Sequence, residues 1–336
     1  MSFFGTQSKM TLQDLIEKYS AYQIEMRRYF HQHPEESTKE VKTAERIREE
    51  LDKAEIPWRV CGMGTGTLAR IEGKLPGKTI MLRGDIDALS VTEKTGLPFA
   101  SENEGVMHAC GHDAHTSTGL AVAHWFADHK DEMKGKLKIL FQPAEEGVRG
   151  AAGMAASGIV DDADYFLGAH IAMMCKTGEL SVKPYGFLCT TKLDVTYTGR
   201  PAHAGVEPNA GRNAMAAACN AFVQLLGIAR HGSGMTRINV GQLIAGEGRN
   251  VIPSHALMKM EVRGETGDIN QYMYDAAVAI IKGCAISQGC EYKIEKMGEA
   301  VDLTNDEELV DVLTKAGEAV EGMTVRKDPM NFGGSE

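Results

Sequence analysis

The 336-residue sequence contains no run of about 18 apolar residues of the kind that spans a membrane. Its N-terminus also lacks the basic region followed by an apolar run that marks an export signal. Basic residues are in deficit, since 36 lysines and arginines stand against 46 acidic residues, and they form no cluster. Because nucleic acids and anionic membranes attract clustered positive charge, neither is an expected partner.

Cysteine is also scarce, and its seven occurrences are scattered along the chain. An odd, dispersed set in a long chain does not resemble a disulfide framework, so we expect a reducing, cytoplasmic location. The balance of 43% hydrophobic and 24% charged residues is typical of a globular protein, and the length allows two domains.

Helix-like and strand-like segments alternate in the first part of the chain. Strands that alternate with helices favour an α/β fold with a mostly parallel sheet covered on both faces. Polar clusters follow several of the expected strands, and strand ends are where ligands bind in such sheets. The expected helices span residues 11–30, 40–54, 117–129 and 150–157, and the expected strands span 58–61, 67–71, 79–83, 136–141 and 165–170.

The segment 188–299 has a different order of elements. Its pattern predicts β-α-β-β-α-β, the split motif of a small α/β sandwich. We therefore expect a smaller domain at 188–299, inserted into a catalytic domain made of residues 1–187 and 300–336. A helix at 306–320 is expected to return to the first domain.

The stretch Met107-His-Ala-Cys-Gly-His-Asp-Ala-His115 is rich in metal-binding side chains. It supplies imidazole, thiol and carboxylate groups, which transition metals prefer as ligands. Gly111 lies between Cys110 and His112, where the absence of a side chain allows a tight turn. Two neighbouring ligands do not make a site, so further ligands must come from elsewhere in the chain.

Adjacent glutamates, Glu145 and Glu146, follow the expected strand at 136–141. Neighbouring side chains on an extended backbone point to opposite sides, so one carboxylate can hold a metal while the other accepts a proton. Two solvated loop glutamates are the simpler alternative. Together with Cys110, His112 and His170, however, Glu146 completes a mixed sulfur, nitrogen and oxygen set that suits zinc, manganese or cobalt. A cysteine nucleophile would leave the glutamate pair unexplained.

Five motifs follow one another along the chain: Arg83-Gly-Asp-Ile-Asp-Ala-Leu89, Met107-His-Ala-Cys-Gly-His-Asp113, Phe141-Gln-Pro-Ala-Glu-Glu-Gly147, Gly199 to His203 with Pro208 to Ala214, and Gly248-Arg-Asn-Val-Ile-Pro253. In these motifs the sequence resembles the M20 metallopeptidase family, and within it the amidohydrolase branch that cleaves N-acyl amino acids. The resemblance runs from about residue 24 to the last residue. It implies hydrolysis of the amide bond of an N-acyl or N-aryl amino acid. The final Gly334-Ser-Glu336 is one of the segments that favour p-aminobenzoyl-glutamate as the leading substrate.

By position, the resemblance implies two divalent metal ions per subunit, manganese or zinc or cobalt. Cys110 would bridge the two ions, with His112, Glu146 and His170 as further ligands, and Glu145 would be the general base. Asp87 matches an acidic residue that orients a metal-binding histidine. Asp85 stands where related members carry that histidine, so the roles of the two aspartates stay open. For His108 and His115 we expect helix capping or supporting hydrogen bonds.

The resemblance also implies that the smaller domain dimerises and contributes to the neighbouring active site. His203 would polarise the scissile carbonyl from the partner subunit, as an oxyanion donor. Asn250 and Arg263 match residues that hold the substrate's carboxylate. The expected assembly is a homodimer, or a heteromer with a related subunit.

One departure concerns the last ligand of the site. Members of this family carry a final histidine ligand beyond the Gly-Ser-Glu segment with which this sequence ends, so we expect weak metal binding and poor turnover from these 336 residues alone. Alternatives are the deacylation of other N-acyl amino acids, such as benzoyl-glycine, N-acetyl-diaminopimelate or an auxin conjugate. A noncatalytic binding protein of the same fold also stays open.

Overall fold

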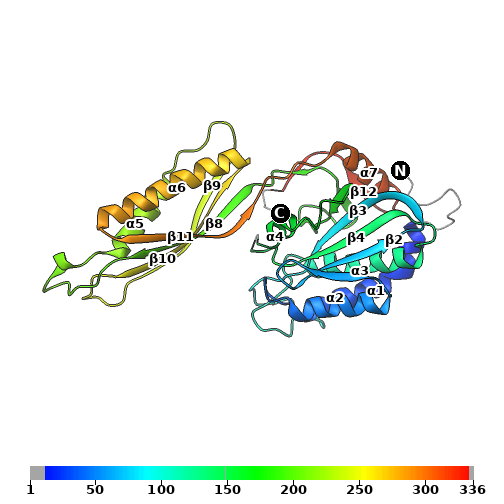
Figure 1. The fold of residues 1–336 in the computed structure, drawn as a ribbon, viewed down its shortest axis with the longest axis horizontal. Coiled ribbons are helices and arrows are strands. Elements are labelled where there is room, and N and C mark those ends of the chain that lie inside the picture. Colours follow the sequence, from blue (N-terminus) through cyan, green and yellow to red (C-terminus); the bar gives the residue numbers. More distant parts are fainter. Residues whose placement is uncertain (1–11, 148, 333–336) are drawn as a thin grey trace. The chain divides into compact units, whose positions relative to one another are not determined.

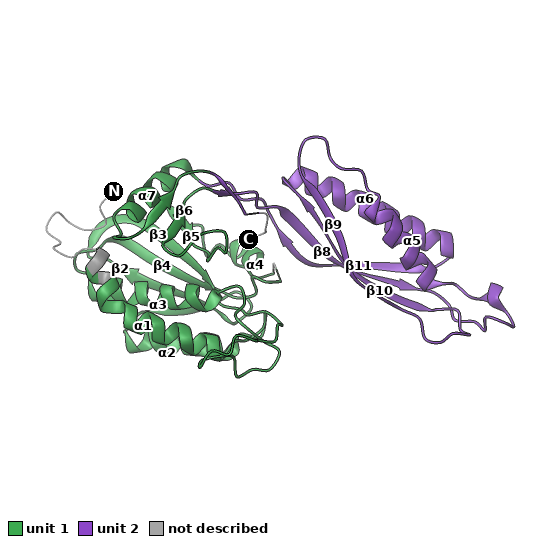
Figure 2. Cartoon of the chain, turned by 180° about the vertical axis from the view of Figure 1, so that it is seen from behind, with its two compact units in different colours: residues 1–183, 306–328 green, residues 184–305, 329–336 purple. Residues whose placement is uncertain are grey.

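The computed structural model describes residues 12–147 and 149–332, which fall into two compact units (Figure 2). Unit 1 contains residues 1–183 and 306–328, and unit 2 contains residues 184–305 and 329–336. The segment predicted as the smaller domain, 188–299, lies within unit 2. The motif Gly334-Ser-Glu336 lies outside the described residues.

Unit 1 is built on a five-stranded sheet in the order β1-β2-β4-β3-β5. The α/β class is confirmed, but the sheet is mixed: β3 runs parallel to β4 and β5, whereas β2 runs antiparallel to β1 and β4. Only a short turn at residues 62–65 joins β1 to β2, and such a turn can join only antiparallel strands. The strands are β1 (Trp58–Cys61), β2 (Gly66–Glu72), β3 (Leu75–Asp85), β4 (Lys134–Gln142) and β5 (Tyr165–Gly168).

Helices cover both faces of this sheet (Figure 1). Side chains alternate along β4, so Leu137, Ile139 and Phe141 pack with the residues of α1, α2 and α3. Leu140 points to the opposite face and packs against Met154 of α4. The helices of unit 1 are α1 (Leu12–Gln32), α2 (Val41–Lys53), α3 (His112–Asp128), α4 (Gly150–Ala156) and α7 (Glu307–Glu318), and a small parallel pair is formed by β6 (Glu179–Ser181) and β12 (Thr324–Arg326).

Helix α3 begins at His112, five residues before the apolar periodicity at 117–129 starts, and residues 113–116 lie at its N-terminus as expected. The apolar periodicity starts late because the first turn carries the polar side chains of the metal-binding stretch, and these are buried: His112, Asp113 and His115. The position before the helix is Gly111, whose φ of 92° lies in the left-handed region that glycine adopts without strain. The predicted role of Gly111 in a tight turn is therefore confirmed.

Unit 2 contains a four-stranded antiparallel sheet in the order β11-β8-β10-β9. Its elements follow the predicted order β-α-β-β-α-β, and both helices pack on one face around a core that includes Tyr197, Leu225, Met258 and Ile281. These elements are β8 (Cys189–Thr198), the short helix η1 (Pro208–Ala210), α5 (Ala214–Leu226), β9 (Thr236–Ala245), β10 (His255–Gly264), α6 (Gly267–Gln288) and β11 (Glu291–Ala300), with a parallel pair β7 (Pro184–Tyr185) and β13 (Met330–Asn331).

None of the helices within residues 12–147 and 149–332 is both long and apolar enough to span a bilayer.

Candidate metal centre

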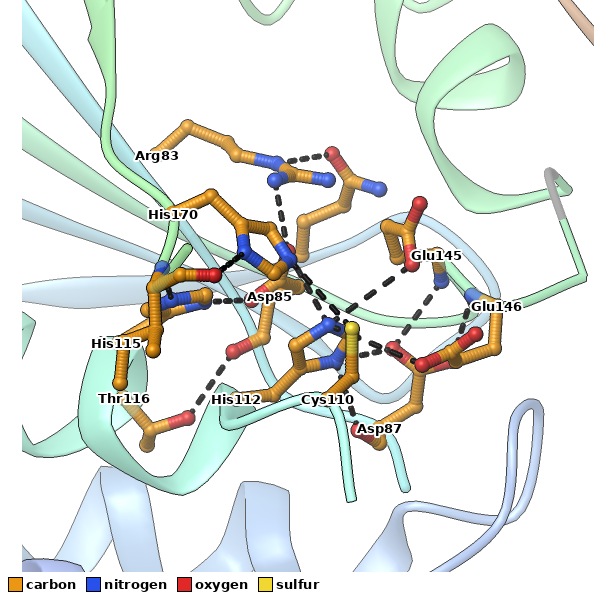
Figure 3. A network of polar contacts seen from close by, with 12 residues as sticks. Arg83, Asp85, Asp87, Cys110, His112, His115, Thr116, Glu145, Glu146 and His170 are labelled. Carbon is orange, nitrogen blue, oxygen red and sulfur yellow. Dashed lines mark hydrogen bonds and ion pairs between the residues drawn. The ribbon is translucent and has the colours of Figure 1, made fainter. Parts of the chain in front are cut away.

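Three parallel strands and one helix end bring the predicted unit 1 residues together (Figure 3). Strand β3 ends at Asp85, β4 ends three residues before Glu145, and β5 ends two residues before His170. Because parallel strands share a carboxyl edge, the segments that follow them meet there. Helix α3 adds His112 from its first residue, so four distant segments of the chain form one cluster.

Cys110, His112 and Glu146 form the compact part of this cluster, because one ligand atom from each lies within 4.8 Å of the others. His170 is next to them, with its Nε2 3.5 Å from the Sγ of Cys110. The structure therefore brings together all four side chains predicted to ligate metal.

Asp87 holds the segment that carries the two glutamates. Its Oδ1 accepts the backbone N–H of Glu145 at 3.1 Å, and its Oδ2 accepts that of Glu146 at 3.0 Å. The Nδ1 of His112 donates to the backbone oxygen of Asp87 at 2.8 Å, while the carboxylate Oδ1 is 3.5 Å away. The carboxylate of Asp87 thus fixes the segment that carries the two glutamates. The backbone carbonyl of Asp87 fixes the orientation of His112.

Asp85 and His115 lie beside the cluster and are bonded to each other. The Oδ1 of Asp85 is 2.5 Å from the Nδ1 of His115, and its Oδ2 accepts from Arg83 at 2.7 Å. Burial by itself raises the pKa of Asp85, but His115 and Arg83 hold that pKa well below its usual range. The supporting hydrogen bonds expected of His115 are therefore present.

The surroundings of the second ring nitrogen of His112, Nε2, indicate whether the cluster suits a metal ion. This buried Nε2 makes no hydrogen bond within the described residues, although Asp85, Glu145 and Glu146 each place a carboxylate oxygen 3.6–3.9 Å from it. Burial by itself lowers the pKa of His112, yet Asp87, Cys110 and Asp85 raise it to about 11. The surrounding negative charge favours a cation at this nitrogen, and the mixed donor set fits a borderline divalent metal.

His108 has a different environment from the other histidines of the stretch. It is 4% exposed, and neither of its ring nitrogens has a hydrogen-bond partner in the described part of the chain. Burial lowers its pKa to about 4, so the ring is neutral at physiological pH. The supporting hydrogen bonds predicted for His108 are not present among these residues.

The three predicted residues of unit 2 do not form one cluster. His203 and Asn250 are exposed and lie on adjacent segments. His203 pairs with Val251, and the N–H of Ala204 donates to the backbone oxygen of Asn250 at 2.9 Å. These two contacts bring the loop after β8 together with the loop between β9 and β10, so His203 and Asn250 lie at the same end of the sheet.

Arg263 lies near the other end of β10, where its Nε is 2.9 Å from Glu261. The strand rises about 26 Å over the eight residues from His255 to Arg263. Within one chain, Asn250 and Arg263 therefore cannot hold the same carboxylate.

Two supporting residues were not predicted from the sequence. Glu40, at the start of α2, is fully buried and accepts the backbone N–H of Ala144 at 2.8 Å, just before the glutamate pair. Arg83 donates to Asp85 and also to Gln142, which joins the ends of β3 and β4. Arg83 could have been singled out because it is a charged residue inside an apolar strand. The residues around Glu40 in the sequence give no sign that its carboxylate binds the N–H of Ala144.

A family comparison bears on this geometry. The model of Peptidase family M20/M25/M40 matches residues 81–336. The chain belongs to this family. The match to M20/M25/M40 includes Cys110, His112, the glutamate pair and His170, and it extends through unit 2.

Individual relatives agree with this membership. A Haemophilus influenzae protein, named as the homolog of a p-aminobenzoyl-glutamate hydrolase subunit, is 56% identical over 256 residues, which cover 74% of this chain and 60% of that protein. The chain thus spans about three fifths of the length of this curated relative.

Two solved structures have the same fold. The aminobenzoyl-glutamate utilization protein from Klebsiella pneumoniae is 31% identical with a TM-score of 0.84, over 97% of this chain and 88% of that one. A Bacillus subtilis protein described as a dinuclear metal binding peptidase of the M20 family is 28% identical with a TM-score of 0.70, over 94% and 84% of the two chains. The family and the α/β fold class predicted from the sequence are confirmed.

Proposed function

We propose that this protein is a metal-dependent amidohydrolase that cleaves the amide bond of an N-acyl or N-aryl amino acid. The leading substrate is p-aminobenzoyl-glutamate, which would yield p-aminobenzoate and glutamate. One observation carries the proposal: the carboxylates of Glu145 and Glu146 both lie within 4 Å of the Nε2 of His112, at the centre of a cysteine and histidine cluster. The names of the Haemophilus and Klebsiella relatives support the choice of substrate.

Cys110, His112, Glu146 and His170 are the residues that would hold two divalent ions. Manganese and zinc are the leading metals and cobalt is a third, because a mixed thiolate, imidazole and carboxylate set accepts each of them. When bound, such ions supply Lewis acidity that polarises an amide carbonyl and lowers the pKa of water. The dinuclear description of the Bacillus relative supports the number of ions.

Glu145 is the proton carrier in this proposal. Its Oε2 accepts the proton of the attacking water, and the same oxygen then delivers that proton to the leaving amine nitrogen. The side chain is 10% exposed, so little bulk water competes for the proton. The carboxylate of Asp87 accepts the backbone N–H groups of Glu145 and Glu146, and these hydrogen bonds keep the two glutamate side chains in place.

Unit 2 supplies the remaining predicted groups, and we propose that it acts as the dimerisation domain. His203 would donate to the developing oxyanion from a partner subunit, while Asn250 and Arg263 would hold the substrate's carboxylate from two different chains. The assembly is a homodimer or a heteromer with a related subunit. The scattered cysteines support a cytoplasmic location.

A substrate panel tests the proposal. The full-length protein is loaded with manganese or zinc and incubated with p-aminobenzoyl-glutamate, benzoyl-glycine, N-acetyl-diaminopimelate and an indole-acetyl amino acid, and release of the free amine or amino acid is measured. The expected result is release of p-aminobenzoate that the Glu145→Gln variant does not support. Turnover of another substrate alone rejects p-aminobenzoyl-glutamate, and no turnover of any amide favours a noncatalytic binding protein.

A further inference from the structure

A second group of side chains lies beside the proposed metal ligands. Asp85, His112, His115 and His170 each offer one ligand atom, and these atoms lie within 4.8 Å of one another. By distance alone, Asp85 and His115 can be further ligands. Their hydrogen bonds, however, indicate that they orient a metal ligand rather than bind metal themselves.

Both ring nitrogens of His115 are already engaged. Its Nε2 lies 3.0 Å from the backbone N of Ile171, and a backbone amide can only donate. The Nε2 is therefore an acceptor, and the ring proton is on Nδ1, which donates to Asp85 at 2.5 Å. With both nitrogens committed, no lone pair of His115 points toward a metal ion.

Asp85 is fixed from its other side. Its Oδ2 accepts from the guanidinium of Arg83 at 2.7 Å, and the Nε of Arg83 donates to the Gln142 side chain at 2.9 Å. Asp85 is fully buried, and its backbone oxygen also accepts from the hydroxyl of Thr116 at 3.0 Å. The carboxylate therefore holds His115 in one orientation.

The far end of this chain of hydrogen bonds is His170. Its Nδ1 lies 2.7 Å from the backbone oxygen of Ile171, and a carbonyl can only accept, so Nδ1 carries the proton. With that proton on Nδ1, Nε2 is the ring nitrogen that can offer a lone pair, and it is the atom 3.5 Å from the Sγ of Cys110. Figure 3 shows His170 between His115 and the cysteine.

Packing against the cysteine segment supports the same arrangement. A Cβ placed on Gly111 would lie 3.3 Å from the Cδ1 of Ile171, so the absent side chain lets Ile171 lie close to the turn between Cys110 and His112. The rings of His115 and His170 are also in contact, with centroids 4.6 Å apart.

We propose that His115, oriented by Asp85 and Arg83, is a positioning residue: it accepts the Ile171 N–H and thereby holds the Nε2 of His170 toward Cys110. The inference rests on the metal site of the proposed function, but it is independent of which amide is hydrolysed. Mutation of the hydrogen-bond partners that orient metal-binding histidines typically weakens metal affinity about 10- to 100-fold.

The first test needs no metal. Nitrogen-15 NMR of the histidine rings in the metal-free protein reports which ring nitrogen carries the proton. We expect the proton of the His115 ring on Nδ1 and a hydrogen bond from the Ile171 N–H at Nε2. A proton on Nε2 overturns the proposal, because the ring then cannot accept the Ile171 N–H.

The second test measures zinc binding by equilibrium dialysis in two variants that separate the two bonds of His115. An asparagine places its amide NH₂ near the Nδ1 position and has no atom near Nε2, whereas a glutamine places its carbonyl oxygen near Nε2. We therefore expect about 10- to 100-fold weaker zinc binding in His115→Asn and close to wild-type affinity in His115→Gln, with the same number of ions bound in both.

His124→Asn is the matched control, since His124 lies on the same helix and contacts Tyr22 rather than the site. Wild-type affinity in His115→Asn, or the loss of one zinc ion in both His115 variants, overturns the proposal. The absorption spectrum of the cobalt-loaded protein adds a readout of the thiolate environment, which we expect His115→Asn to shift and His115→Gln to restore. Failure of the protein to hydrolyse any amide would reject the proposed function while leaving these results intact.

Discussion

The two units place their predicted functional residues in different ways. In unit 1, the segments after β3, β4 and β5 converge because these strands are parallel, and four distant parts of the chain meet in one buried cluster. In unit 2, all neighbouring strands of the main sheet are antiparallel. His203 and Asn250 therefore follow one end of that sheet, and Arg263 lies near the other.

The difference teaches where a single chain can form a site unaided. A parallel sheet collects its strand-end residues along one edge, whereas an antiparallel sheet distributes them over two edges. The residues of unit 1 can act together within one chain. The predicted residues of unit 2 can act on one substrate only if a second chain brings them together.

The largest effects are expected inside the unit 1 cluster. Glu145→Gln should lower kcat about 100- to 10,000-fold because the proton carrier is lost, while the metal content is unchanged. Glu146→Gln should instead lose bound metal, because a ligand is removed. Turnover and elemental analysis on both variants check this; equal metal loss in the two would contradict the separate roles.

The comparison predicts a different outcome for unit 2. His203→Ala should lower kcat/KM about 100- to 1,000-fold through loss of an oxyanion donor, with metal content and thermal stability unchanged. Its exposed position in the structure is the reason that stability should not change.

Mixed dimers show whether His203 acts across subunits. Glu145→Gln and His203→Ala chains are co-expressed and purified through two different tags, so that each dimer holds one of each. If His203 serves the neighbouring site, one of the two sites in a twofold-symmetric dimer is intact, and about half of the wild-type activity returns. Mixed dimers as inactive as either parent would place His203 in its own chain's site or outside catalysis.

Next in size is the effect of Glu40 on unit 1. Its carboxylate accepts the N–H groups of Thr38 and Ala144, two non-glycine residues with φ of 72° and 55°. Glu40→Ala removes the acceptor of the buried Ala144 N–H and the part-buried Thr38 N–H, and it should cost about 2–3 kcal/mol of stability. Thermal or denaturant unfolding measures the loss, with Glu45→Ala on the exposed side of α2 as the control. Equal stability of the two variants would contradict the supporting role of Glu40.

The smallest effect concerns pH. The hydrogen bond to Asp113, and after it the one to Glu93, raise the pKa of His31 above 6.5 against the opposing effect of burial. A raised pKa means that the stabilisation, on the order of 2 kcal/mol, is fully present below about pH 6.5 and is lost as the pH rises through the folded-state pKa. The unfolding midpoints of wild type and His31→Gln should therefore differ most at low pH and converge at high pH. A gap that is constant with pH would contradict this assignment, and the more exposed neighbouring His33→Gln serves as the control.

The sequence by itself was enough to predict much of this protein, because several signals are local. Apolar periodicity located most helices and strands, and the order of elements in unit 2 matched its pattern. Cys110, His112, Glu145 and Glu146 could be proposed as one site because thiol, imidazole and carboxylate groups together form a donor set that suits borderline divalent metals, and the structure brings these four side chains close together.

Tertiary structure alone decided the contacts between distant segments. The hydrogen bond between Glu40 and Ala144 joins residues 104 positions apart, and the one between His115 and Ile171 joins residues 56 positions apart. No local sequence pattern encodes such a pairing. The tertiary structure also explains why the apolar periodicity of α3 starts after its first turn, since that turn faces the polar site rather than the core. Side-chain chemistry is a property of the residue, but hydrogen-bond partners depend on which strand ends the fold brings to one edge.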